Sequence, residues 1–159
     1  MKTENLTKRL DDDKEILTVN PNKLELPTFY GAEGDSKRRV SGTFPLCSAT
    51  GTKASSLVYF ELDPGFELGT HTDSGEETVF IVEGTVEVTI NNRQKRLVQG
   101  EMALVPEMEP HNFKNVGSKK AKVMGFFPKP DIVATFEKVF MPINQKVIDT
   151  TQMPVANMK

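Results

Sequence analysis

One stretch of the chain decides its fold: residues 65–84 read GFELGTHTDSGEETVFIVEG and contain His71, Asp73 and Glu77. Residues i and i+2 of an extended strand point to the same side, so His71 and Asp73 should converge on one face. Residues 74–76, Ser-Gly-Glu, allow a break in the strand. Glu77 then opens the next strand and can turn inward. The stretch therefore predicts three side chains that can bind one metal ion together.

A second stretch supplies the other histidine of the chain. Residues 100–115 read GEMALVPEMEPHNFKN, and His111 follows Pro106 and Pro110. Because His111 belongs to a later strand, it would approach the first group from across a barrel. Two imidazoles and two carboxylates are a competent ligand set for Fe(II), Mn(II), Ni(II) or Zn(II). We expect one divalent metal ion per chain, bound by His71, Asp73, Glu77 and His111.

The two stretches resemble the two motifs of the cupin family. The first cupin motif is Gly, five residues, His, one residue, His, three or four residues, Glu, six residues, Gly. Residues 65–84 keep this spacing, with Asp73 where the second His usually stands. The second motif is Gly, five residues, Pro, one residue, Gly, two residues, His, three residues, Asn, and residues 100–115 keep it with Met108 in place of a Gly. The fifteen residues between the motifs resemble the short spacer of small single-domain bacterial cupins.

The resemblance implies a jelly-roll barrel, also called a double-stranded β-helix, with a metal ion inside it. It places His71, Asp73, Glu77 and His111 at the positions of the family's four metal ligands. It also places Gly65, Gly84, Gly100 and Pro106 at turns. A carboxylate in place of an imidazole makes the site harder and more negative, which favours Mn(II), Fe(II) or Zn(II) over copper. The substitution leaves open a site of three ligands in which Asp73 contacts the metal through water.

Hydrophobic periodicity predicts an all-β fold. From residue 55 to residue 127, short apolar runs alternate with Gly, Pro and Asn, and no part keeps a helical period. We expect strands at residues 56–62, 78–82, 85–90, 94–98, 102–105, 111–115 and 121–127. Asn91-Asn92-Arg93 predicts a hairpin turn between two of them.

The flanking segments differ from the barrel in composition. We expect residues 1–20 to form a flexible or irregular N-terminal tail and residues 21–127 to form the barrel. Residues 128–159 contain four prolines and predict an extended C-terminal arm. The apolar residues of this arm must cover a surface, either of the barrel or of a partner subunit. An exposed β-edge is a further hazard for a monomer, so we expect a homodimer.

Composition excludes several classes of protein. A formal net charge of −2 argues against nucleic-acid binding. No apolar run approaches the roughly 20 residues needed to cross a bilayer, so we expect no membrane association. The polar N-terminus lacks the apolar centre of a secretory signal, which makes a cytoplasmic location the default. Cys47, the single cysteine, is interpreted as a packing residue.

Three functions are compatible with such a site. The first is a non-haem metal-dependent dioxygenase acting on a small organic molecule. The second is a redox-neutral isomerase, lyase or decarboxylase, and the third is a non-catalytic module that binds a metal or a small ligand. Phe113, Tyr59 and Phe126 are the candidates for a substrate pocket. No separate general base is identifiable, so proton transfer would rely on metal-bound hydroxide, Asp73 or Tyr59.

Overall fold

The computed structural model describes residues 16–153, which form a single twisted sheet without α-helices. Its strands are β1 (Thr28–Gly31), β2 (Arg39–Leu46), β3 (Ser56–Leu62), β4 (His71–Asp73), β5 (Glu77–Glu83), β6 (Thr85–Ile90), β7 (Arg93–Val98), β8 (Met102–Val105), β9 (His111–Asn115), β10 (Ala121–Phe127), β11 (Val133–Met141) and β12 (Gln145–Asp149). Three single-turn 3-10 helices complete the described chain: η1 (Pro21–Lys23), η2 (Ser48–Thr50) and η3 (Thr150–Gln152). None of the helices in this part of the chain is long and apolar enough to cross a membrane.

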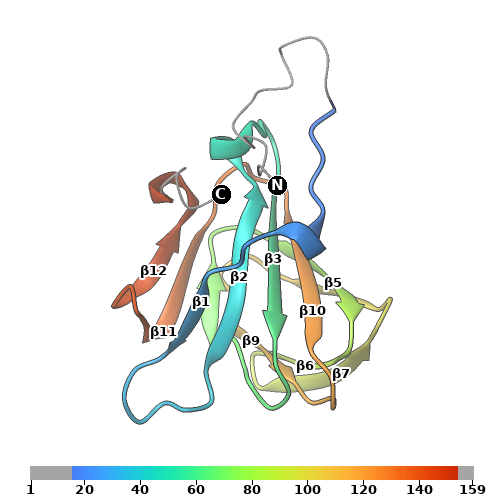
Figure 1. Cartoon of the computed structure of the whole chain (residues 1–159), viewed down its shortest axis with the longest axis vertical. Helices are drawn as coiled ribbons and strands as arrows, with labels where there is room; N and C mark the ends of the chain where they lie inside the picture. The colour runs from blue at the N-terminus through green and yellow to red at the C-terminus, as the bar shows by residue number, and fades with distance from the viewer. Residues whose placement is uncertain (1–15, 154–159) are drawn as a thin grey trace.

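The sheet folds back on itself to enclose the core. Its strand order is β7-β6-β9-β4-β11-β1-β2-β3-β10-β5-β8, with β12 paired to β11. In Figure 1, β1, β2 and β3 run down the front of the molecule, with β11 and β12 on one side and β5, β6 and β7 on the other. Phe60 of β3 meets Phe113 of β9 with ring centroids 5.7 Å apart, although four strands lie between β3 and β9 along the sheet. The contact shows that two halves of the sheet face each other, which confirms the predicted all-β jelly-roll barrel.

The strands expected between residues 56 and 127 are all present, with bounds that differ by one residue at most. The turn between β6 and β7 is the predicted hairpin. Asn91 has φ 47° and Asn92 has φ 65°, the pair of positive values that a two-residue type I′ turn requires. Asparagine tolerates this conformation better than other non-glycine residues. The register of β6 and β7, with Ile90 opposite Arg93, follows from this turn.

The C-terminal segment differs from the expected extended arm. Residues 133–141 form β11, which lies inside the sheet between β4 and β1, and β12 returns along it as a hairpin. Ala134, Phe136 and Phe140 are buried in the core of the same chain, so these side chains do not require a partner subunit to cover them. The prolines of this segment had predicted an extended arm. Pro130 and Pro142 instead flank β11 and leave a proline-free run between them, which can form a strand. The homodimer remains a prediction.

The N-terminal part of the described chain adds two strands that the sequence pattern did not resolve. Strand β1 pairs with β2 and β11, and β2 pairs with β3. Pro45 lies within β2 where the register with β3 shifts between Thr43 and Leu46, which is the kind of irregularity that accommodates a proline. Residues 16–20 have no regular structure, and the remainder of the expected tail, residues 1–15, lies outside the described residues.

Candidate metal centre

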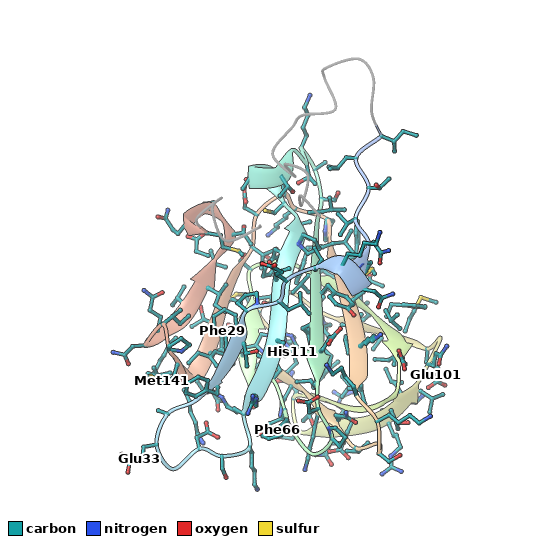
Figure 2. All side chains as sticks on the ribbon, viewed as in Figure 1. Phe29, Glu33, Phe66, Glu101, His111 and Met141 are labelled. Atoms are coloured by element: carbon teal, nitrogen blue, oxygen red, sulfur yellow. The ribbon has the colours of Figure 1, made fainter. Side chains whose placement is uncertain are left out.

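Four buried side chains meet inside the barrel. His71 and Asp73 are the first and last residues of β4, and His71 lies directly opposite His111, the first residue of β9. Glu77 begins β5 after the short break at residues 74–76. The four residues are between 1% and 5% exposed. Figure 2 labels His111 within the outline of the barrel, near β2 and β3 in this view.

Backbone carbonyl groups orient both imidazoles in the same way. His71 Nδ1 lies 2.8 Å from the carbonyl oxygen of Gly69, and His111 Nδ1 lies 2.8 Å from that of Glu109. A carbonyl only accepts hydrogen bonds, so each Nδ1 carries a proton and donates it. This tautomer leaves the Nε2 lone pair of the neutral ring free to bind a metal ion, and carbonyl partners of this type are common behind metal-binding histidines.

Asn112 holds one of these carbonyl groups in place. Its side-chain oxygen accepts a hydrogen bond of 2.8 Å from the backbone N–H of Gly69. Gly69 has φ 103°, a conformation that favours glycine, and its carbonyl then faces His71. Asn112 was not among the predicted site residues. Its position next to His111, on the opposite face of β9, was the only available signal.

The ligand atoms are close enough to share one ion. His71 Nε2 lies 3.6 Å from Asp73 Oδ2, and His111 Nε2 lies 3.1 Å from the same oxygen. His71, Asp73 and His111 each offer an atom within 4.8 Å of the others. Two atoms bound to one ion at about 2.0–2.2 Å are separated by roughly 2.8–3.6 Å when the angle between them is octahedral (cis) or tetrahedral. The measured separations therefore fit a metal centre, and the direct contacts of Asp73 fit a ligand better than a residue acting through water.

Glu77 extends the group from the side of β5. Glu77 Oε2 lies 3.4 Å from His111 Nε2, and both atoms are buried without a hydrogen-bond partner. Buried polar atoms in native proteins are rarely left unpaired. A cation bound between these two atoms would satisfy both. The donor set of two nitrogens and two carboxylates thus fits a divalent ion.

The side chains of this group shift one another's pKa values even without a metal ion. Burial by itself would raise the pKa of Asp73, yet the contacts with His111 and His71 outweigh burial and lower it to about 2. Burial raises the pKa of Glu77, against the opposing effect of His111. Burial would lower the pKa of His111, but Asp73 and Glu77 raise it to about 10. The two carboxylates therefore stabilise positive charge at this point of the barrel.

A cavity of about 100 Å³ adjoins the cluster. His71, Asp73 and Glu77 form part of its wall, together with Phe113, the pocket residue expected from its place two positions after His111. Phe136 of β11 also lines the cavity and stacks on His71, with ring centroids 4.6 Å apart. Phe136 was not predicted as a pocket residue because residues 128–159 were expected to form an arm.

Tyr59 and Phe126 do not line the cavity. Phe126 is 42% exposed on the outer face of β10, and its neighbour Phe127 points inward instead. The hydroxyl of Tyr59 donates a hydrogen bond of 2.9 Å to Glu61, and Phe60 takes the inward position on β3. The sequence could have indicated this orientation. Period-two alternation places the charged residues Lys122 and Glu61 on the same outer face as Phe126 and Tyr59, respectively.

Comparison with known proteins agrees with this architecture. Residues 58–127 match a family described as the cupin domain. Among curated proteins, none is similar enough to the chain to count as a match. A predicted oxalate decarboxylase from Thermotoga maritima is 20% identical, with 70% of this chain and 98% of that chain covered and a TM-score of 0.60.

Two further solved structures share the fold. The oxalate decarboxylase of Lactobacillus farciminis, in a formate complex, is 20% identical with a TM-score of 0.59; the match covers 72% of this chain but only 33% of that enzyme. The cupin domain of Schizosaccharomyces pombe Cnp3 is 14% identical with a TM-score of 0.56, over 72% of this chain and 75% of that one. Identities this low show the fold alone. The match at residues 58–127, the jelly-roll barrel and the group of potential metal ligands together identify a cupin domain in this chain.

Proposed function

We propose that this chain binds one divalent metal ion through His71, Asp73, Glu77 and His111, and that it is a non-haem dioxygenase acting on a small organic molecule. The observation that carries the proposal is that three residues of the ligand group, His71, Asp73 and Glu77, lie in the wall of an apolar cavity. A ligand in that cavity would meet the metal ion away from bulk water. When bound, a redox-active divalent ion supplies the electron transfer to O2 that organic molecules do not achieve by themselves.

The choice of Fe(II) or Mn(II) rests on the ligand set. Two carboxylates balance the charge of a divalent ion, and nitrogen and oxygen ligands favour these ions over copper. Zn(II) or Ni(II) would also bind such a set, but Zn(II) does not change its oxidation state. Metal identity therefore separates an oxidative function from a redox-neutral one.

The lack of a separate acid or base in the cavity favours dioxygenation over isomerisation or elimination. Among the described residues that line the cavity, Thr43 is the only polar side chain besides His71, Asp73 and Glu77. A redox-neutral isomerase or lyase commonly needs a positioned base to remove a proton from carbon. Tyr59 cannot serve, because its hydroxyl points to Glu61 outside the cavity and burial, together with Glu61, raises its pKa.

Metal analysis combined with O2 uptake tests the proposal. Protein purified without chelator should contain about one divalent ion per chain. It should consume O2 with at least one member of a panel of small carboxylates, phenols and thiols. The variant His71→Ala/His111→Ala should lose both properties, whereas Lys95→Ala, on the exposed face of β7, should keep both.

Three outcomes would contradict the proposal in different ways. Stoichiometric metal in the double histidine variant would show that the ion binds elsewhere. Metal binding without O2 uptake, but with turnover of a panel compound in the absence of O2, would identify a redox-neutral enzyme. Metal binding with no turnover of any kind would leave a metal-binding module.

A further inference from the structure

We infer that the ligand of the metal centre has a compact apolar body and a single anionic group, which binds the metal ion; this inference rests on the proposed function and adds a substrate class to it. The cavity wall is the first reason. Apart from the metal-binding side chains and the hydroxyl of Thr43, the described lining residues are apolar or glycine. Six of them are phenylalanines: Phe29, Phe44, Phe60, Phe113, Phe127 and Phe136.

The distribution of cationic side chains is the second reason. No lysine or arginine is among the described residues that line the cavity. Arg38 is buried near the same core, but its guanidinium donates to the carbonyl oxygens of Lys138 and Val139, at 2.9 and 2.8 Å, and lies over the ring of Phe140. It is therefore engaged in holding β11. An anionic group of the ligand that does not reach the metal ion would be buried without a counter-charge, which is strongly unfavourable.

The charge balance of the centre sets the number of anionic groups. Asp73 and Glu77 together neutralise a divalent ion when both histidines are neutral. One further anionic group can bind the ion directly and gain from that contact. A second anionic group on the far side of the ligand would meet apolar side chains and, as its one polar neighbour among the described lining residues, the uncharged hydroxyl of Thr43. The site therefore disfavours ligands that carry a second charged group far from the metal ion.

The size of the cavity limits the apolar body. Its volume is about 100 Å³, somewhat less than an engineered cavity of about 150 Å³ that binds benzene. A body of about one aromatic ring, or a short branched aliphatic chain, matches this space. Phenylalanine rings prefer edge-to-face and offset contacts with other aromatic rings. The aromatic wall thus suits a flat ring.

Two neighbouring residues of β12 provide a matched pair for a test. Ile148 lines the cavity and pairs with Ala134, whose partner on the other side is Asp73. Adjacent strands are about 4.8 Å apart, so Ile148 lies roughly 10 Å from Asp73 across the sheet. Ile148 can therefore contact the far part of a ligand without being part of the metal centre. Val147 points to the opposite face and is 44% exposed.

Calorimetric titration of the metal-loaded full chain with p-toluate and terephthalate tests the charge requirement. The two probes have similar shapes, but terephthalate carries a second carboxylate in place of the methyl group. We expect p-toluate to bind at least about tenfold more tightly. Equal affinities, or tighter binding of terephthalate, would overturn the inference.

The variants Ile148→Trp and Val147→Trp test the location. Ile148→Trp should fill the cavity and weaken p-toluate binding by about tenfold or more, while Val147→Trp should change it less than about twofold. Metal content, measured on the same samples, should match the unmodified chain in both variants. Unchanged p-toluate affinity in Ile148→Trp protein with full metal content would show that the ligand does not occupy this cavity.

Toluene separates failure of this inference from failure of the proposed function. It has the same apolar body but no group that binds a metal. We expect chelator-treated protein to bind toluene and Ile148→Trp to abolish that binding. If the chain holds no metal but still binds toluene in this way, the proposed metal-dependent function is wrong, whereas the assignment of the cavity as an apolar ligand site is supported. If metal binds and neither toluene nor p-toluate does, the substrate class is wrong and the metal centre stands.

Discussion

Gly125 of β10 faces Glu77 of β5 so closely that no side chain fits between them. A β-carbon on Gly125 would lie 2.9 Å from the carboxyl carbon of Glu77 and 2.8 Å from Val58 Cγ1, and closer still to Glu77 Oε1. The two strands are paired in register from Val123 to Phe126, so the backbone at Gly125 cannot move away easily. The absence of a side chain at Gly125 therefore makes room for one of the four expected metal ligands.

Gly125→Ala should weaken metal binding. The added methyl group must displace the Glu77 carboxylate, because the alternative is a shift of two paired strands. We expect a loss of about 10- to 100-fold in metal affinity, the range seen when the residues that support a ligand are altered. Competition with a chromogenic chelator measures this loss. Gly117→Ala is the control, since the nearest atoms to its β-carbon lie at an ordinary 3.4 Å; equal affinities in the two variants would contradict the role assigned to Gly125.

Substitution of Asp73 should distinguish a direct ligand from a bystander. Asp73 Oδ2 contacts both histidines, which places it at the centre of the group. Asp73→Ala should weaken metal binding by more than about 100-fold if Asp73 binds the ion directly, and by about 10- to 100-fold if it acts through water. Asp73→His should keep metal binding and shift the preference toward softer ions. Chelator competition with a series of divalent ions compares the three proteins, and indistinguishable values would reduce the site to His71, Glu77 and His111.

Met108→Gly should increase the free energy of unfolding. Met108 has φ 62°, which is unfavourable for a residue with a side chain, and its backbone N–H donates to the carbonyl oxygen of Asp73 at 2.9 Å. The left-handed conformation costs about 1–2 kcal/mol, while glycine loses about 0.5–1 kcal/mol through its greater freedom in the unfolded chain. We expect a net gain of roughly 0.5–1 kcal/mol in urea unfolding.

Met102→Gly is the matched control for that experiment. Met102 is also exposed but lies in strand β8, where glycine should lower the free energy of unfolding by roughly 0.5–1 kcal/mol. Destabilisation of similar size in both variants would mean that the backbone at Met108 is not strained.

Tyr59 should make the fold sensitive to alkaline pH. Burial, followed by the hydrogen bond to Glu61, raises the pKa of Tyr59 in the folded chain above its value in the unfolded chain. The stabilisation is therefore fully present below about pH 10 and is lost as the pH rises above that value. Tyr59→Phe removes the hydrogen bond and should cost about 0.5–1.5 kcal/mol near neutral pH.

The difference between Tyr59→Phe and the unmodified chain should shrink at alkaline pH. Urea unfolding at about pH 7 and about pH 11 measures it, since the second value lies above the ordinary tyrosine pKa. Tyr30→Phe serves as the control because Tyr30 is 46% exposed. A difference that stays constant between the two pH values would show that Tyr59 is not protected from ionisation by the fold.

The sequence by itself determined the strands between residues 56 and 127 and predicted which residues form the candidate ligand group. Both depend on local geometry. Period-two alternation places His71 and Asp73 on one face, and Asn91-Asn92 adopts the hairpin turn through its own backbone preference. The spacing of the two motifs then brought His111 into the same group, and the structure places it directly opposite His71.

Only the tertiary structure decided how residues 128–153 are used and which phenylalanines face the metal centre. Strand β11 lies between β4 and β1, partners that are about 60 and 110 residues earlier in the chain, and no local pattern encodes such pairings. The stacking of Phe136 on His71 and the lack of space at Gly125 depend in the same way on strands that meet across the sheet. Local periodicity specifies the face on which a side chain lies, whereas its neighbours follow from long-range strand pairing that forms only when the whole barrel closes.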